Sequence, residues 1–243
     1  MRGFLRGFVR VLVVQNFEST GLGQVGAALE EAKAALEFKK PYLGETLPEG
    51  CGGHDALIVL GGGQNAIADD EHPYLPRLAA LMREFAEGEK AVLGICLGSQ
   101  ILARAFGATN LIGAAPEFGW QEVQLTKEAA NDPVLSVLPQ RFPIFQWHDD
   151  TFTLPPGAVR LAANDSAENQ AFRVHRAAYG IQFHFEADRP LVVRWNERFA
   201  DAIAQKDAGW PQRFSSEAAR HGPLADDVGK RIARAWVGQI RAA

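Results

Sequence analysis

The chain has 243 residues, 47% of them hydrophobic and 22% charged, which is enough for one globular domain with a sizeable core. It carries 25 Lys and Arg against 29 Asp and Glu, a formal net charge of −4 without long charge runs. This balance argues against a basic surface for nucleic acid or anionic lipid, so we expect neither a nucleic-acid nor a membrane partner.

The N-terminal region shows no targeting or membrane signal. Arg10 interrupts its apolar residues, which leaves a stretch too short for a signal peptide or a membrane span. Residues 1–8 are a candidate flexible leader. Two cysteines, Cys51 and Cys96, are too few for a disulfide framework and are typical of a cytoplasmic protein.

The first half of the chain alternates between short apolar runs and segments with helical spacing. Continuous apolar runs of this kind are typical of strands that are buried on both faces. Strands that alternate with helices indicate βαβ units and a parallel sheet. The expected strands are 9–15, 56–60 and 91–95, and the expected helices are 25–38, 75–87 and 98–106.

The pattern changes to alternating strands in the second half and to helices at the end. Some of these later strands are expected to be antiparallel. The expected strands are 120–125, 142–146, 159–162, 171–174 and 178–183, and the expected helices are 191–205 and 226–240, separated by Gly209, Trp210 and Pro211. We therefore predict an α/β domain over residues 9–190 and a helical extension over 191–243 that packs on it.

Cys96 is the first candidate catalytic residue. It lies between a buried strand and a helix, with Gly94 and Gly98 two positions away on either side. A sharp strand-to-helix turn that exposes a nucleophile needs such small neighbours, and a helix N-terminus favours a thiolate. The alternative is a structural cysteine buried at the end of an apolar strand.

His184 and Glu186 form the second candidate motif, at the end of the last expected strand. Two positions apart in an extended chain, they point to the same side, so the carboxylate can orient the imidazole. A base held by a third group is the usual arrangement for activating a cysteine. The alternative for His184 is a strand-end histidine with a structural hydrogen bond.

Four motifs together resemble those of class I glutamine amidotransferase domains. In chain order they are Leu60-Gly61-Gly62-Gly63, Gly94-Ile95-Cys96-Leu97-Gly98-Ser99-Gln100, Gln146-Trp147-His148-Asp149-Asp150-Thr151-Phe152 and Gln182-Phe183-His184-Phe185-Glu186. The resemblance covers residues 9–186 and is strongest to stand-alone domains related to that of GMP synthase and to the γ-glutamyl peptidases. It implies a flavodoxin-like, three-layer α/β/α fold with a mostly parallel central sheet.

The resemblance also implies a catalytic triad of Cys96, His184 and Glu186. Cys96 would attack the side-chain amide of glutamine and form a γ-glutamyl thioester. His184 would protonate the departing ammonia and then activate water, and Glu186 would orient His184.

Five further residues are implied by the same resemblance. The backbone N–H groups of Gly62 and Leu97 would form the oxyanion hole, and Gln100, His148 and Asp149 would bind the amino-acid end of the substrate. Judged on the residues alone, the glycines are equally compatible with a turn, Gln100 with an exposed helix position, and His148 and Asp149 with a structural turn.

The expected function is therefore glutaminase-type hydrolysis that releases ammonia to an acceptor, without a cofactor. Because the segment after Glu186 is short and reads as helices, a synthase or acceptor domain would be a separate partner protein. One alternative is a free-standing hydrolase of γ-glutamyl peptides. Another, of a different class, is a non-catalytic binding or sensor module.

The remaining candidates have structural interpretations. Cys51 and His54 resemble half of a metal site, but no second pair has ligand spacing, so we expect no metal. Trp195, Trp210 and Trp236 are expected to pack the C-terminal helices, or a partner.

Overall fold

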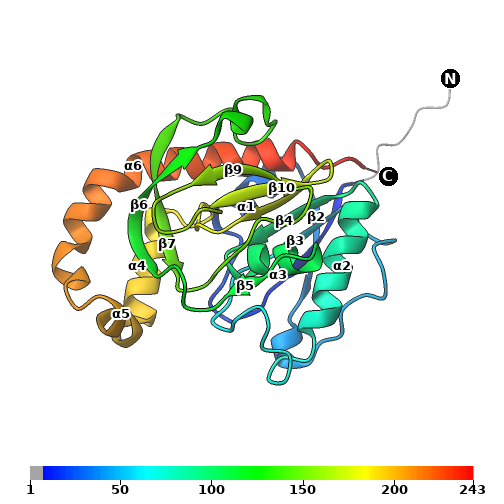
Figure 1. The fold of residues 1–243 in the computed structure, drawn as a ribbon, viewed down its shortest axis with the longest axis horizontal. Helices are drawn as coiled ribbons and strands as arrows, with labels where there is room; N and C mark the ends of the chain where they lie inside the picture. Colours follow the sequence, from blue (N-terminus) through cyan, green and yellow to red (C-terminus); the bar gives the residue numbers. More distant parts are fainter. Residues whose placement is uncertain (1–7, 243) are drawn as a thin grey trace.

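The computed structural model describes residues 8–242, so the candidate leader 1–8 lies outside the described residues except for Phe8. A nine-stranded sheet runs through the molecule in the order β2-β1-β3-β4-β11-β10-β9-β6-β7 (Figure 1). Its strands are β1 Arg10–Val14, β2 Ala35–Lys39, β3 Ala56–Val59, β4 Ala91–Ile95, β6 Glu117–Leu125, β7 Arg141–His148, β9 Val159–Ala163, β10 Ala171–Val174 and β11 Ala178–Ile181. A second, two-stranded sheet pairs β5 Asn110–Leu111 with β8 Thr151–Phe152.

The sheet has a parallel and an antiparallel half. Strands β2, β1, β3, β4 and β11 pair in parallel, and β10, β9, β6 and β7 continue the sheet through antiparallel pairs. Residues 56–59 and 91–95 are buried without interruption, as the continuous apolar runs predicted, because helices cover both faces of these strands. The parallel half carries the candidate site.

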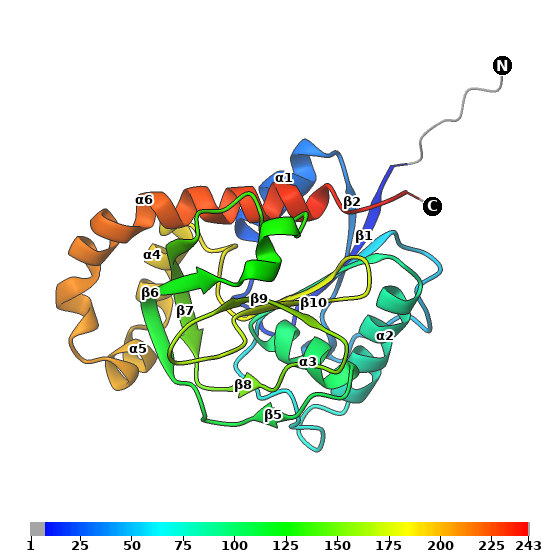
Figure 2. The same cartoon turned by 45° about the horizontal axis from the view of Figure 1, so that its top comes forward.

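Helices cover both faces of the sheet, which confirms the predicted three-layer α/β/α architecture. Figure 2 shows α1 and α6 on one side of the sheet and α2 and α3 on the other. The helices are α1 Gly23–Glu31, α2 Leu75–Glu87, α3 Leu97–Ala105, α4 Arg189–Arg198, α5 Ala200–Lys206 and α6 Trp210–Val237, with 3₁₀ turns at Pro41–Leu43 and Lys127–Asn131.

The C-terminal helices share a core with the sheet. In α6, Val228, Ile232 and Trp236 are fully buried in the cluster that also holds α1 and one face of the strands. The Trp236 indole N–H donates to the carbonyl of Val92 at 3.2 Å. No helix of residues 8–242 is long and apolar enough to cross a membrane.

Three predicted helices have different bounds in the structure. The predicted helix 25–38 is wrong in its second half, because α1 ends at Glu31 and β2 follows as an edge strand paired with β1. The segment predicted as 191–205 is divided at Phe199 into α4 and α5. The predicted start at 226 is also wrong, because α6 begins at Trp210 and continues through Pro223.

Candidate active site

The candidate site lies at the carboxyl edge of the parallel half of the sheet, where β4 and β11 end side by side. Ile95 pairs with Ile181, and the Cys96 N–H donates to the Ile181 carbonyl at 2.9 Å. The chain after β11 then leads directly to His184. Two motifs far apart in the sequence therefore meet at one edge, as carboxyl ends of adjacent parallel strands do.

The backbone at Cys96 adopts the sharp turn that its glycine neighbours predicted. Its φ of 51° and ψ of −111° are unfavourable for a non-glycine residue. A Cβ on Gly94 would lie 2.3 Å from the carbonyl oxygen of Gly98, and one on Gly98 would lie 2.1 Å from that of Val59. Both positions exclude a side chain, so the turn needs both glycines.

His184 lies between Cys96 and Glu186. Its Nδ1 is 2.7 Å from Glu186 Oε1, and its ring also forms a side-chain hydrogen bond with Cys96. All three side chains are buried, with exposed fractions of 4–7%. The sequence predicted an extended chain here, but β11 ends at Ile181 and residues 182–187 form a turn, which still brings the carboxylate to the imidazole.

The surroundings of His184 favour its protonated form. Burial acts to lower the pKa of His184, but the charges of Glu186 and Cys96 and the hydrogen bonds to both raise it well above the usual range. The edge of the Trp195 ring packs against the imidazole at 5.2 Å between ring centroids. This arrangement can hold a thiolate–imidazolium pair, which is the reactive form of a catalytic cysteine.

The two backbone groups expected to form an oxyanion hole lie beside Cys96. Leu97 begins α3, so its N–H belongs to the N-terminal end of that helix. Gly62 lies in the loop after β3, where a Cβ would come within 2.5 Å of Gln64 Oε1 and 2.8 Å of Leu97 Cδ2. The chain at Gly62 can approach a substrate only because it has no side chain.

Two cavities meet at Cys96, and Gly62, Gly63 and Trp147 line both of them. The first, which we call the polar cavity, has a volume of about 320 Å³. Its other lining residues are Gln64, Asn65, Leu97, Gln100, His148, Asp149 and Asp150. The second, which we call the aromatic chamber, has a volume of about 230 Å³. Its other lining residues are Phe17, Ser19, Thr20, His184, Trp195 and Phe199.

Gln100 faces the polar cavity from α3 and is only 3% exposed, so the exposed helix position considered for it is wrong. Its side-chain amide donates to the Asp150 carbonyl at 3.3 Å and to Gln182 Oε1 at 3.2 Å. These bonds fix the orientation of the Gln100 side chain beside Cys96.

His148 and Asp149 also line the polar cavity, at the bend between β7 and β8. The His148 side chain is buried and points away from solvent, with Nδ1 3.0 Å from the Asp150 carbonyl. Asp149 is exposed and accepts a hydrogen bond from Lys206 of α5 at 2.5 Å. The segment is thus both a structural turn and part of the cavity wall.

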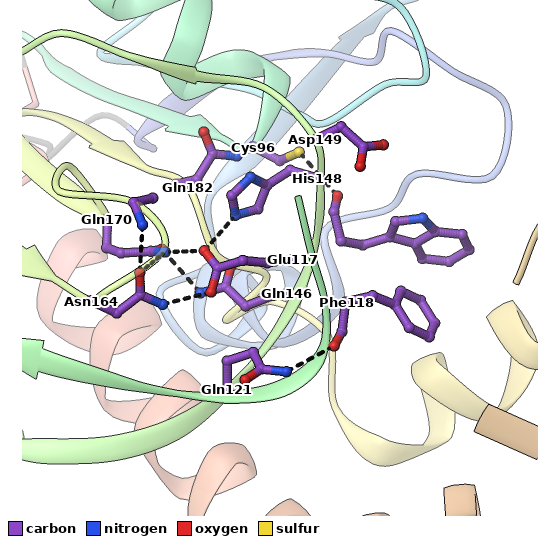
Figure 3. A network of polar contacts seen from close by, with 12 residues as sticks. Cys96, Glu117, Phe118, Gln121, Gln146, His148, Asp149, Asn164, Gln170 and Gln182 are labelled. Carbon is purple, nitrogen blue, oxygen red and sulfur yellow. Dashed lines mark hydrogen bonds and ion pairs between the residues drawn. The ribbon is translucent and has the colours of Figure 1, made fainter. Parts of the chain in front are cut away.

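A buried polar network lies behind this bend (Figure 3). Glu117 Oε2 lies 3.1 Å from His148 Nε2 and accepts a hydrogen bond from Gln170 at 2.6 Å, and Asn164 donates to Glu117 Oε1 at 2.6 Å. Gln146 extends the network through Gln170 Oε1 at 3.0 Å. The network joins β6, β7 and the segment before β10, and so fixes the wall of the polar cavity from behind.

The sequence did not single out Glu117 or the residues Phe17, Phe199 and Thr20 of the aromatic chamber. The available signal for Glu117 was a carboxylate at the start of an alternating strand, which is ordinarily exposed. The chamber residues lie far apart in the chain and have no common motif, so only the fold brings them together.

The residues assigned structural roles do have such contacts. His54 is buried with Nε2 2.9 Å from Glu37, and Cys51 is half-buried, with its carbonyl bound by Lys90. Within residues 8–242, no group of three or more His, Cys, Asp or Glu side chains is placed to hold a metal ion. Each of the tryptophans expected to pack the C-terminal helices is at most 7% exposed; they are Trp195, Trp210 and Trp236.

Comparisons with known proteins agree with this geometry. A family model described as glutamine amidotransferase class-I matches residues 45–190. The glutamine amidotransferase-like protein YfeJ of Salmonella typhimurium is 29% identical, over 82% of this chain and 85% of its own. One subunit of the glutamine-hydrolysing GMP synthase of Methanospirillum hungatei is 33% identical, over 72% of this chain and 85% of its own. The crystal structure of a glutamine amidotransferase from Thermotoga maritima superposes with a TM-score of 0.82 at 30% identity, covering 95% of this chain and 99% of that one.

Proposed function

The chain belongs to the class-I glutamine amidotransferase family, and from this premise we propose that it hydrolyses the side-chain amide of glutamine through a thioester on Cys96. The observation that carries the proposal is the contact of His184 with Cys96 on one side and Glu186 on the other. A nucleophile, a base and an orienting carboxylate in contact are the elements that cysteine-dependent amide hydrolysis needs.

In the first step, the Cys96 thiolate attacks the side-chain carbonyl carbon and His184 donates its proton to the departing nitrogen. The C–N bond breaks, ammonia leaves and the γ-glutamyl group remains on Cys96. His184 then removes a proton from water, which attacks the thioester and releases glutamate. Glu186 holds the imidazole in position and stabilises its protonated form through both steps.

The negative charge that develops on the carbonyl oxygen is placed beside the N–H groups of Leu97 and Gly62. Donors fixed in advance stabilise such a charge strongly because they need no reorganisation during the reaction. The polar cavity then holds the amino-acid end of the substrate against Gln100, His148 and Asp149. Its polar lining fits a zwitterionic substrate better than the aromatic chamber does.

The released ammonia passes to an acceptor on another polypeptide in this proposal. Support comes from relatives of similar length that are named as single subunits of glutamine-hydrolysing GMP synthases. A second candidate, a free-standing hydrolase of larger γ-glutamyl compounds, is favoured by the size of the aromatic chamber on the His184 side. The contacts among the three candidate catalytic groups favour either activity over a non-catalytic binding module.

The proposal is tested by ammonia release from L-glutamine. Cys96→Ala should reduce the rate at least about 10³-fold, because no other nucleophile contacts His184 among the described residues. Cys51→Ala is the matched control and should retain the wild-type rate. Equal rates for wild type and Cys96→Ala would exclude Cys96 from the mechanism.

A further inference from the structure

The two cavities lie on opposite sides of the reacting groups. His184 lines the aromatic chamber and is not among the residues around the polar cavity, whereas Gln100 and Leu97 line only the polar cavity. The proton donor for a departing amine must face that amine, and the oxyanion donors must face the acyl group. The leaving group of the reaction therefore points into the aromatic chamber.

The chamber is far larger than ammonia requires. Its volume of about 230 Å³ exceeds the roughly 150 Å³ of an apolar protein cavity that binds benzene. Its walls are rings in mutual contact: Trp147 packs edge-on against Phe199 at 5.6 Å and against Trp195 at 5.9 Å. Phe17 lies 6.1 Å from Phe199, on the other side of the opening.

Much of the chamber comes from outside the part of the chain that matches the family model. Phe17, Ser19 and Thr20 precede residues 45–190, and Trp195 and Phe199 follow them. The residues of the polar cavity, in contrast, all lie within the matched region. The acyl side of the site therefore lies in the matched family region, and the chamber is formed largely by segments added to it.

The N-terminal wall of the chamber is fixed before any ligand binds. The Gln15 side-chain amide donates to the carbonyls of Glu18 and Thr20, at 3.1 and 2.7 Å. The Thr20 hydroxyl donates to the Phe17 carbonyl at 2.8 Å. A loop held by such bonds loses little conformational entropy on binding, which favours a preformed pocket.

The lining also indicates the charge of the group that fits. Apart from His184, no lining residue of the chamber, as the structure describes it, has a cationic side chain. Arg198, next to Phe199, pairs with Glu18. A carboxylate buried in the chamber would thus have no free positive partner and would pay a desolvation penalty.

We propose that the aromatic chamber is a leaving-group pocket, and that the site hydrolyses γ-glutamyl amides of neutral, apolar amines, arylalkylamines above all, in addition to glutamine. This inference rests on the proposed thioester mechanism and names its substrate class. Cys96 Sγ bonds to the γ-carbonyl carbon, the C–N bond breaks, and the amine leaves with the proton from His184. Water then hydrolyses the thioester, so that one amide and one water give glutamate and one free amine.

Three probes separate the features of the leaving group. γ-Glutamylethylamide lacks a ring, γ-glutamylphenethylamide adds one, and γ-glutamylphenylalanine adds a carboxylate to the same amine. We expect kcat/KM for the phenethylamide to exceed that for the ethylamide by about tenfold or more, because a phenyl group becomes buried. The phenylalanine compound should be at least about tenfold poorer than the phenethylamide.

Phe17→Ala tests whether the chamber causes this preference. Phe17 is 37% exposed in a loop, so the variant should fold, and we expect the phenethylamide-to-ethylamide ratio to fall at least about threefold. The matched control is Phe38→Ala on the edge strand β2, a 43% exposed phenylalanine that lines neither cavity. It should leave the ratio unchanged.

The outcomes distinguish this inference from the function on which it rests. Hydrolysis of glutamine and the ethylamide without preference for the phenethylamide would overturn the leaving-group pocket alone. A preference that Phe17→Ala does not reduce would also overturn it. If no probe, glutamine included, is hydrolysed faster than by Cys96→Ala, the proposed function fails and the inference fails with it.

Discussion

Cys96 holds a backbone conformation that costs about 1–3 kcal/mol for a non-glycine residue. The surrounding structure stabilises it through the hydrogen bond to Ile181 and the close packing of Gly94 and Gly98. The strain directs the thiol away from the strand and toward His184, at the start of α3. The sequence predicted this much because the requirement for small neighbours is local.

At the same scale, Glu186 sets the protonation state of His184. Its charge raises the pKa of His184, so the imidazolium persists above the usual range and is lost as pH rises through the raised value. Glu186→Gln removes the charge, and we expect the pKa of His184 to fall. The alkaline limb of kcat/KM for glutamine should therefore move to lower pH.

The pH–rate profile measures this shift directly. Glu122→Gln, which changes an exposed carboxylate on β6, is the control and should keep the wild-type profile. An alkaline limb at the same pH in Glu186→Gln and wild type would show that Glu186 does not control the titration of His184.

At the scale of elements, prediction succeeded where burial was two-sided and failed where pairing was remote. The helix Leu75–Glu87 has the predicted bounds because its apolar spacing is regular. Strand β2 was missed because it is a largely exposed edge strand, which only the pairing with β1 makes extended. Pro223 was expected to lie outside a helix, but α6 continues through it.

Glu117 shows the same limit within the candidate site. Its role depends on Asn164, Gln170 and His148, which come from other segments, so no local pattern could reveal it. The triad, by contrast, was recognisable from two short motifs. Residues that act through motifs were therefore predictable, and residues that act through the tertiary packing of β6, β7 and the loop before β10 were not.

Glu117→Gln tests the importance of this network. The new amide cannot accept from both Asn164 and Gln170 while facing His148, so one buried donor loses its partner. We expect a destabilisation of about 1–3 kcal/mol, measured by urea denaturation. KM for glutamine should rise more than kcat falls, because His148 and Asp149 line the polar cavity.

Glu122→Gln, on the same strand but exposed, is again the matched control and should change stability by less than about 0.5 kcal/mol. Equal stability of Glu117→Gln and wild type, with an unchanged KM, would mean that the network does not hold the cavity wall.

At the scale of the whole molecule, one sheet edge joins three parts of the chain. The parallel half supplies Cys96 and His184, and the antiparallel half supplies the bend at His148 and Asp149. The C-terminal helices close the site from a third side, with Trp195 in the aromatic chamber and Lys206 on Asp149. The extension predicted for residues 191–243 thus contributes to the candidate site as well as to the core.

The measurement that tests the central claim most directly is covalent trapping by a glutamine analogue that carries a diazoketone in place of the amide. Peptide mapping by mass spectrometry then locates the adduct. We expect one adduct, on Cys96, with loss of glutamine hydrolysis in proportion to labelling and protection by excess glutamine. An adduct chiefly on Cys51, or hydrolysis that persists after Cys96 is fully labelled, would contradict the assignment of Cys96 as the nucleophile.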